Sequence, residues 1–128
     1  MKKRPDVLEW ITKSEQDYQT AVVMARKRKV PVPDVVGFHC QQCIEKYLKA
    51  LLVMKKLDFP KTHDLLDLLA ILTENEPLLD VLKPELRTLN PFSVQFRYPG
   101  ESATVEESQK ALAAMKHVRK YLKDRFSF

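Results

Sequence analysis

Apolar residues recur along most of the chain at intervals of three and four, which is the spacing of one face of an α-helix. The pattern predicts a first helix that opens at Pro5 and Asp6 and stops before Pro31 and Pro33, because proline cannot continue a helix. Its apolar face consists of Leu8, Ile11, Tyr18, Val22 and Ala25. No segment shows the period-two alternation of a half-buried strand.

Three more helical segments are expected in the middle of the chain. The second helix runs from an N-cap at Asp34 to about Leu57. The third, "HDLLDLLAIL", is capped by Thr62. The fourth segment opens at Pro77 and is interrupted or restarted at Pro84.

The C-terminal third combines an irregular segment with a final helix. Residues 91–102 contain two prolines and no helical period, which predicts a long loop. Thr104 and Glu107 match a capping box at the start of the last helix. The apolar face of that helix is Val105, Leu112, Met115, Val118 and Leu122. We therefore expect one all-α domain over residues 1–128, an up-and-down bundle of four to five helices.

Composition restricts the class of protein. The chain is 45% hydrophobic and 30% charged, which is an ordinary balance for a soluble domain. It has no apolar run long enough to span a bilayer and no secretory signal, so we expect a cytoplasmic protein without membrane attachment. The formal net charge of +5 permits contact with nucleotides or nucleic acid but does not require it.

Cys40 and Cys43 are candidates for a metal half-site, a redox pair or core packing. On a helix they share one face with Ile44, Tyr47 and other apolar residues of the segment "FHCQQCIEKYLKALL". No second Cys-x-x-Cys or His-x-x-x-His supplies further zinc ligands, and no strand precedes the helix as in a thioredoxin-like site. The pattern favours core packing without a metal, and leaves the other two alternatives open.

The opposite face of the same helix is polar. Its ridge consists of His39, Gln42, Lys46 and Lys49, with Glu45 beside it. Periodicity favours a solvent-exposed face. The histidine and glutamine among the lysines leave open contact with a phosphate, a base edge or a partner helix.

The segment "FHCQQCIEKYLKALL" also resembles the second-helix signature of HEPN domains, which are helical domains of prokaryotes and higher eukaryotes. Three more segments match that family in order: "SEQDYQTA" at 14–21, "PKTHDLLDLL" at 60–69 and "RYPG" at 97–100. The resemblance covers nearly the whole chain and implies a HEPN-like bundle. The matching positions of the second helix are Phe38, His39, Gln41, Gln42, Glu45, Lys46, Leu48, Lys49 and Ala50.

The chain departs from the family at two points. Small residues, commonly alanine, usually stand where this chain has Cys40 and Cys43, which supports core packing. HEPN ribonucleases carry an arginine with about four to six residues between it and the histidine that serves in acid–base chemistry. No arginine stands at that distance before His39, His63 or His117. The resemblance is therefore to the Arg-Tyr-Pro branch of the family, and it leaves enzymatic activity uncertain.

That branch implies a small protein paired with a separate minimal nucleotidyltransferase. Such a pair is similar to the two halves of an aminoglycoside nucleotidyltransferase, whose C-terminal domain is HEPN-like. The implied role is to bind a nucleotide or substrate beside the partner's active site, or to act in a toxin–antitoxin pair. The resemblance also implies a homodimer around the second and last helices. Four phenylalanines outside the periodic segments support an oligomer: Phe92, Phe96, Phe126 and Phe128.

The expected ligand is a nucleotide or RNA, with no other cofactor. Arg97 can pair with a phosphate and Tyr98 can stack on a base, whereas Arg97 in a structural role would form a salt bridge. We expect both residues to converge on one polar cleft with His39, Gln42 and Lys46, and Glu45 or Asp64 to neutralise Arg97 when no ligand is bound. His63 and Asp64 alternatively serve the start of the third helix. The full candidate set is His39, Gln42, Glu45, Lys46, Lys49, His63, Asp64, Arg97 and Tyr98.

Three function classes remain open at this point. The favoured one is a non-catalytic nucleotide-binding and interaction module. The second is a ribonuclease toxin with a non-standard site built from His39, Arg97 and His63. The third is a purely structural subunit that dimerises or binds an antitoxin.

Overall fold

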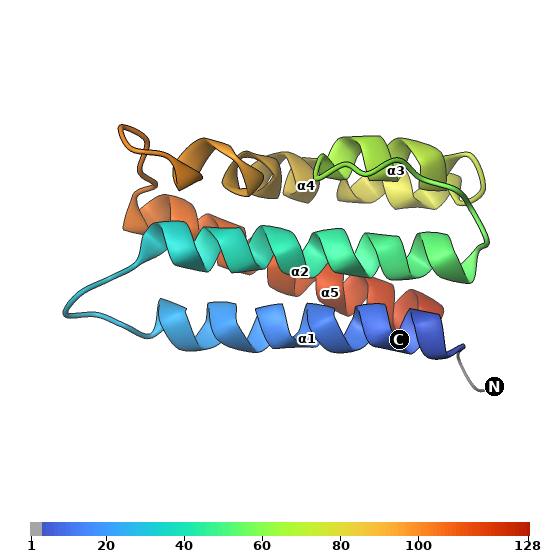
Figure 1. Ribbon diagram of the computed structural model, residues 1–128, viewed down its shortest axis with the longest axis horizontal. Helices are drawn as coiled ribbons and strands as arrows, with labels where there is room; N and C mark the ends of the chain where they lie inside the picture. Colours follow the sequence, from blue (N-terminus) through green and yellow to red (C-terminus); the bar gives the residue numbers. More distant parts are fainter. Residues whose placement is uncertain (1–3) are drawn as a thin grey trace.

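Every regular element of the structure, a computed structural model that describes residues 4–128, is a helix (Figure 1). This confirms the all-α bundle predicted from the spacing of apolar residues. The α-helices are α1 (Pro5–Ala25), α2 (Pro33–Met54), α3 (Leu65–Thr73), α4 (Lys83–Leu89) and α5 (Val105–Phe126). Three short 3-10 helices lie between them: η1 (Pro77–Leu82), η2 (Asn90–Ser93) and η3 (Gln95–Arg97).

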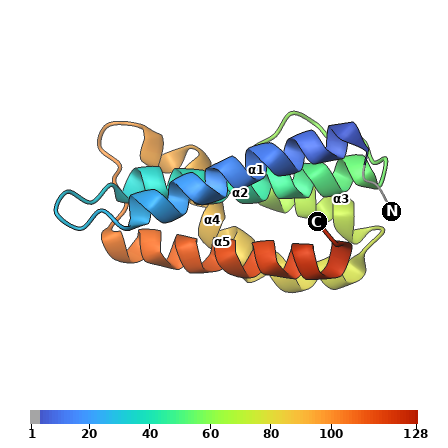
Figure 2. The same cartoon turned by 90° about the horizontal axis from the view of Figure 1, so that it is seen from below.

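Helix α2 is the centre of the bundle. It packs against α1 on one side, against α3 and η2 on another, and against α5 behind (Figures 1 and 2). The connection 55–64 folds back along α2, since the backbone oxygen of His63 accepts a hydrogen bond from Gln41 Nε2 at 2.9 Å. This return places the start of α3 beside the middle of α2, where the candidate polar residues lie.

The two cysteines belong to the core. Cys40 and Cys43 are fully buried and free, together with Ile44, Tyr47 and Leu48. Burial raises the pKa of the Cys43 thiol to about 12 and moves the pKa of Cys40 higher still. The thiols therefore stay protonated at neutral pH and pack as small apolar groups, which confirms the packing interpretation. That they hold no metal stays a prediction, which elemental analysis for zinc tests.

The limits of α2 differ from the expected ones. The N-cap is Val32, not Asp34, because Pro33 already occupies the first turn. The Asp34 carboxylate instead accepts a hydrogen bond from the backbone of Ala103 at 2.6 Å, which ties α2 to the segment before α5. The helix ends at Met54 and not near Leu57, in a Schellman motif with Lys56 at a positive φ of 58°.

The start of α3 also differs from the prediction. Asp64, not Thr62, is the N-cap, and its carboxylate accepts hydrogen bonds from the backbone of Leu66 and Asp67. Thr62 supports this cap by accepting from the Asp64 backbone at 3.1 Å. The Asn90 side chain also holds this cap, because it accepts a hydrogen bond from Leu65 N and donates one to the Asp64 carboxylate. The cap therefore depends on a residue 26 positions away.

The C-terminal third follows the predicted outline. The capping box of Thr104 and Glu107 is present in full. The expected loop is partly ordered as η2 and η3. Phe92 is buried and the other three non-periodic phenylalanines pack against the core, so these rings do not require a dimer to cover them. No helix within residues 4–128 combines the length and the apolar character needed to traverse a bilayer.

Candidate functional site

The polar ridge of α2 meets α1 in a group that we call the Asp17 cluster: Asp17, His39 and Lys46. Asp17 Oδ1 lies 2.8 Å from His39 Nδ1, and Oδ2 lies 2.5 Å from Lys46 Nζ. A carboxylate can only accept, so Nδ1 carries the proton and Nε2 of His39 is left for a contact outside the cluster. Asp17 thereby holds the imidazole in one orientation on the side of the bundle.

A second group, the Glu45 cluster, lies farther along α2 and comprises Gln41, Glu45, Lys49 and His63. Glu45 is only 3% exposed and Lys49 only 8%. Glu45 lies 3.0 Å from both Lys49 Nζ and His63 Nδ1, and Gln41 donates to Glu45 at 3.2 Å. Lys49 also lies 5.8 Å from the ring centroid of Trp10 on α1. The solvent-exposed interpretation of this face is therefore wrong for Glu45 and Lys49, because α1 and the returning connection cover them.

Gln42 extends the Glu45 cluster along the helix. Its Nε2 donates to Gln41 Oε1 at 2.8 Å, and Gln41 in turn contacts Glu45. The polar ridge thus carries two separate hydrogen-bonded groups: one joins α2 to α1 through Asp17, and the other joins α2 to the connection before α3 through Gln41 and His63. Each lysine in it already has a carboxylate partner, so neither is a free cation for a ligand.

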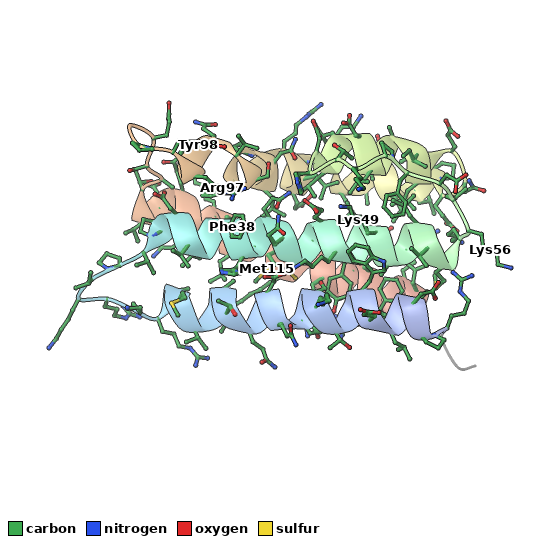
Figure 3. The ribbon with its side chains drawn as sticks, viewed as in Figure 1. Phe38, Lys49, Lys56, Arg97, Tyr98 and Met115 are labelled. Carbon is green, nitrogen blue, oxygen red and sulfur yellow. The ribbon has the colours of Figure 1, made fainter. Side chains whose placement is uncertain are left out.

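Arg97 is different, because it forms no ion pair within residues 4–128. Its guanidinium lies over the Phe38 ring, 5.3 Å from the centroid, and Figure 3 shows it reaching from the loop toward α2. Phe38 contacts His39 edge to face at a centroid distance of 5.4 Å. The expectation that Glu45 or Asp64 neutralises Arg97 is wrong, since Glu45 pairs with Lys49 and His63 and Asp64 caps α3.

Tyr98 lies farther out on the same loop and is 61% exposed (Figure 3). The turn that follows is closed by a hydrogen bond from Glu101 N to Tyr98 O at 3.3 Å. Gly100 has a φ of 91° in this turn, a conformation that disfavours any residue with a Cβ atom. We call Phe38, His39, Arg97 and Tyr98 together the Arg97 end.

The nine candidate residues therefore fall into separate places. Arg97, Tyr98 and His39 share the Arg97 end, and His39 and Lys46 share Asp17. Lys49 is eleven residues beyond Phe38, which is about 16 Å along a helix axis, so one compact site cannot hold both. Asp64 is a helix cap. His63 bonds to Gln41 through its backbone oxygen and to Glu45 through its ring.

Three residues of the site were missed by sequence reasoning. Asp17, Gln41 and Phe38 orient or support the candidate side chains, but only contacts between helices show this. A weak signal existed, because Asp17 is one of the two acidic residues of "SEQDYQTA" and the other two belong to the matching positions of α2.

The model of the HEPN domain family matches residues 7–125, nearly the whole chain. The chain belongs to the HEPN domain family. No curated protein and no solved structure matches it significantly. The geometry of this HEPN domain therefore has to be interpreted from its own contacts.

These contacts give the Arg97 end of the HEPN domain a defined chemistry. It offers a cation without an ion pair in residues 4–128 and an imidazole held by a carboxylate, both beside the Phe38 ring, and an exposed phenol at the next residue, Tyr98. Such a set can bind an anion and stack on a planar group. The Glu45 cluster lacks this capacity, because its charged and amide groups already satisfy one another.

Proposed function

We propose that this HEPN domain is a non-catalytic module that binds a nucleotide at the Arg97 end, beside the active site of a separate nucleotidyltransferase. The observation that carries the proposal is the guanidinium of Arg97, which is solvent-exposed, stacked on Phe38 and without an ion-pair partner in residues 4–128. A planar guanidinium pairs with two phosphate oxygens at once. Stacking on Phe38 holds it in place without using its hydrogen-bond donors.

Two neighbouring side chains support a nucleotide over a simple anion. Tyr98 presents an exposed ring on which a base can stack. His39 has its Nδ1 hydrogen bonded to Asp17, which leaves its Nε2 to accept a hydrogen bond from a ribose hydroxyl. The net charge of +5 adds a favourable long-range field for a polyanion.

Thermal unfolding with ATP, AMP and adenosine tests the proposal. A ligand that binds only the native state raises its stability, so ATP and AMP should stabilise the protein and adenosine should do so less. Arg97→Ala should abolish most of the effect. Arg87→Ala is the matched control, because Arg87 is also exposed but lies on α4. Equal stabilisation of both variants by ATP would contradict a phosphate site at Arg97.

The assembly we propose is a homodimer that associates with the nucleotidyltransferase, in the manner of a toxin–antitoxin pair. Co-expression with the product of the neighbouring reading frame tests the partner. Light scattering of the isolated chain at micromolar concentration tests the homodimer. A monomer mass would contradict the homodimer. It would not bear on the nucleotide site, which the thermal unfolding experiment tests separately.

A second candidate function, RNA cleavage, is favoured by one contact. The Asp17–His39 hydrogen bond orients an imidazole next to Phe38, the ring that also carries Arg97, and an oriented imidazole suits general acid–base chemistry at a phosphodiester. Incubation of the protein with RNA tests it, with His39→Ala and His63→Ala as separate variants. If His39→Ala lost RNA cleavage and His63→Ala kept it, the domain would be a ribonuclease and the non-catalytic proposal would be wrong.

A further inference from the structure

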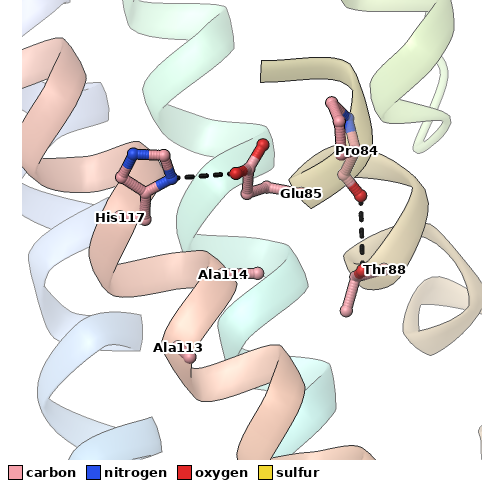
Figure 4. A pocket seen from close by; sticks show the side chains of 6 residues that line it. All are labelled: Pro84, Glu85, Thr88, Ala113, Ala114 and His117. Atoms are coloured by element: carbon pink, nitrogen blue, oxygen red, sulfur yellow. Dashed lines mark hydrogen bonds and ion pairs between the residues drawn. The ribbon is translucent and has the colours of Figure 1, made fainter. Parts of the chain in front are cut away.

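A surface groove of about 350 Å³ lies between α4 and α5. It shares no residue with the Arg97 end. Figure 4 shows its two walls, one from each helix, with Glu85 and His117 facing each other across it. The lining residues are Pro84, Glu85, Thr88, Ala113, Ala114 and His117.

Glu85 is incompletely satisfied in this groove. Its Oε1 lies 2.9 Å from His117 Nδ1, whereas its Oε2 is buried and has no hydrogen-bond partner within residues 4–128. A buried carboxylate oxygen without a donor is unfavourable, because it has lost its water and gained nothing in return. Glu85 lines the groove and the terminal torsion of a glutamate is broad, so a donor that enters the groove can satisfy this oxygen.

The other polar atoms of the groove are also acceptors. Thr88 uses its hydroxyl hydrogen on the backbone oxygen of Pro84 at 3.2 Å, which leaves the lone pairs of Thr88 Oγ1. In the tautomer with the proton on Nδ1, which donates to Glu85, Nε2 of His117 is an acceptor, and the side chain is 61% exposed. Ala113, Ala114 and the Pro84 ring provide an apolar surface beside these acceptors. The groove therefore complements a group that donates hydrogen bonds at one end of a short apolar stem.

We propose that the α4–α5 groove binds a primary alkylammonium group, with the nitrogen at Glu85 and the methylene stem over Ala113 and Ala114. An ammonium is a compact charge with three donors, which suits the one free carboxylate oxygen and the Thr88 hydroxyl. A guanidinium fits less well, because its fork needs both carboxylate oxygens and His117 occupies one. The ammonium group belongs either to a free amine or to a lysine side chain of another protein.

Titration with n-butylammonium, followed by the imidazole NMR signals, tests this site. The chain has three histidines, and the signals of His117 should shift saturably while those of His39 and His63 stay. n-Butanol is the neutral control for the stem. Glu85→Gln keeps an acceptor for His117 but removes the charge, and should weaken binding by about tenfold or more. Glu101→Gln, an exposed carboxylate outside the groove, should bind as the parent does.

A second variant and a second ligand complete the test. Ala113→Leu fills the groove from an exposed position and should block binding without removing Glu85. 1,4-Diaminobutane and a capped lysine amide distinguish a free amine from a protein side chain, and tight binding of either supports the site. The proposal is overturned if butanol shifts His117 as butylammonium does, or if both groove variants bind the amine normally.

Discussion

The Glu45 cluster and the Arg97 end lie on the same face of α2, yet the first is buried and ion-paired whereas the cation of the second is exposed. Glu45 is covered and receives hydrogen bonds or ion pairs from Lys49, His63 and Gln41. Arg97 is exposed and has an aromatic ring beside it, but no carboxylate of residues 4–128 pairs with it. The groups of the Glu45 cluster satisfy one another, so the cluster stabilises the fold but has no donor or acceptor available for a ligand. The Arg97 guanidinium stays hydrated at little cost in free energy and is available to pair with an anion.

The largest expected effect on stability comes from removing the central carboxylate of the Glu45 cluster. Glu45→Ala should destabilise the protein by about 3 kcal/mol, because it leaves Lys49 buried without a counter-charge. Urea unfolding of parent and variant measures this difference. Glu106→Ala, an exposed carboxylate in the first turn of α5, is the control and should cost far less. A loss for Glu45→Ala no larger than that of the control would show that the cluster is structurally dispensable.

The next largest effect concerns the packing behind the Arg97 end. A Cβ atom on Gly37 would overlap the ring of Phe92, which packs 4.8 Å from Phe96 just before Arg97. Gly37→Ala should therefore cost about 2 kcal/mol and also weaken nucleotide binding, because η2 and η3 must move away from α2.

A compensating variant sharpens the same prediction. Phe92→Leu added to Gly37→Ala removes ring atoms from the overlap and should recover part of the lost stability, measured again by urea unfolding. Losses that simply add in the double variant would mean that the two residues do not interact.

A third prediction compares the ion-paired carboxylate of Glu15 with Arg97, which has no ion pair in the described part of the chain. Burial alone raises the pKa of Glu15, but hydrogen bonds from Arg119 and Lys123 outweigh it and lower the pKa from 4.5 to about 2. A carboxyl with a lowered native pKa stabilises the fold above its unfolded pKa, and this stability is lost as the pH falls through the native value.

The expected loss between pH 4.5 and 2 is about 1 kcal/mol, since solvent screens a half-exposed pair. The free energy of unfolding of Glu15→Gln should depend less on pH in this window than that of the parent. Glu9→Gln, an exposed change on the same helix, should leave the parent pH profile in place.

The smallest effect on stability is expected at Arg97 itself. Arg97→Ala removes an exposed side chain with one aromatic contact, so the free energy of unfolding should change by no more than about 0.5 kcal/mol. Nucleotide stabilisation should disappear in the same variant. A large loss of stability instead would show that Arg97, like Glu45, has a structural role.

Much of the fold was predictable because its signals are local. The apolar spacing predicted α1, α2 and α5, the prolines marked their limits, and the Thr104–Glu107 box marked the start of α5. Asp34 and Thr62 were assigned as caps by the same local logic, and both assignments were wrong. Asp34 bonds to Ala103 instead, and the true cap, Asp64, is held by Asn90. A capping side chain has several acceptable partners, and distant residues decide among them.

The sequence by itself determined the helices, the buried face of α2 with its two cysteines, and the family to which the chain belongs, because periodicity and short motifs are properties of neighbouring residues. Only the tertiary structure decided which polar residues of α2 are free. The connection 55–64 folds back over Glu45, and α1 brings Asp17 to His39 and Lys46. Helical spacing places a side chain on a face, but the availability of its charge depends on what packs against that face, and those partners lie up to dozens of residues away.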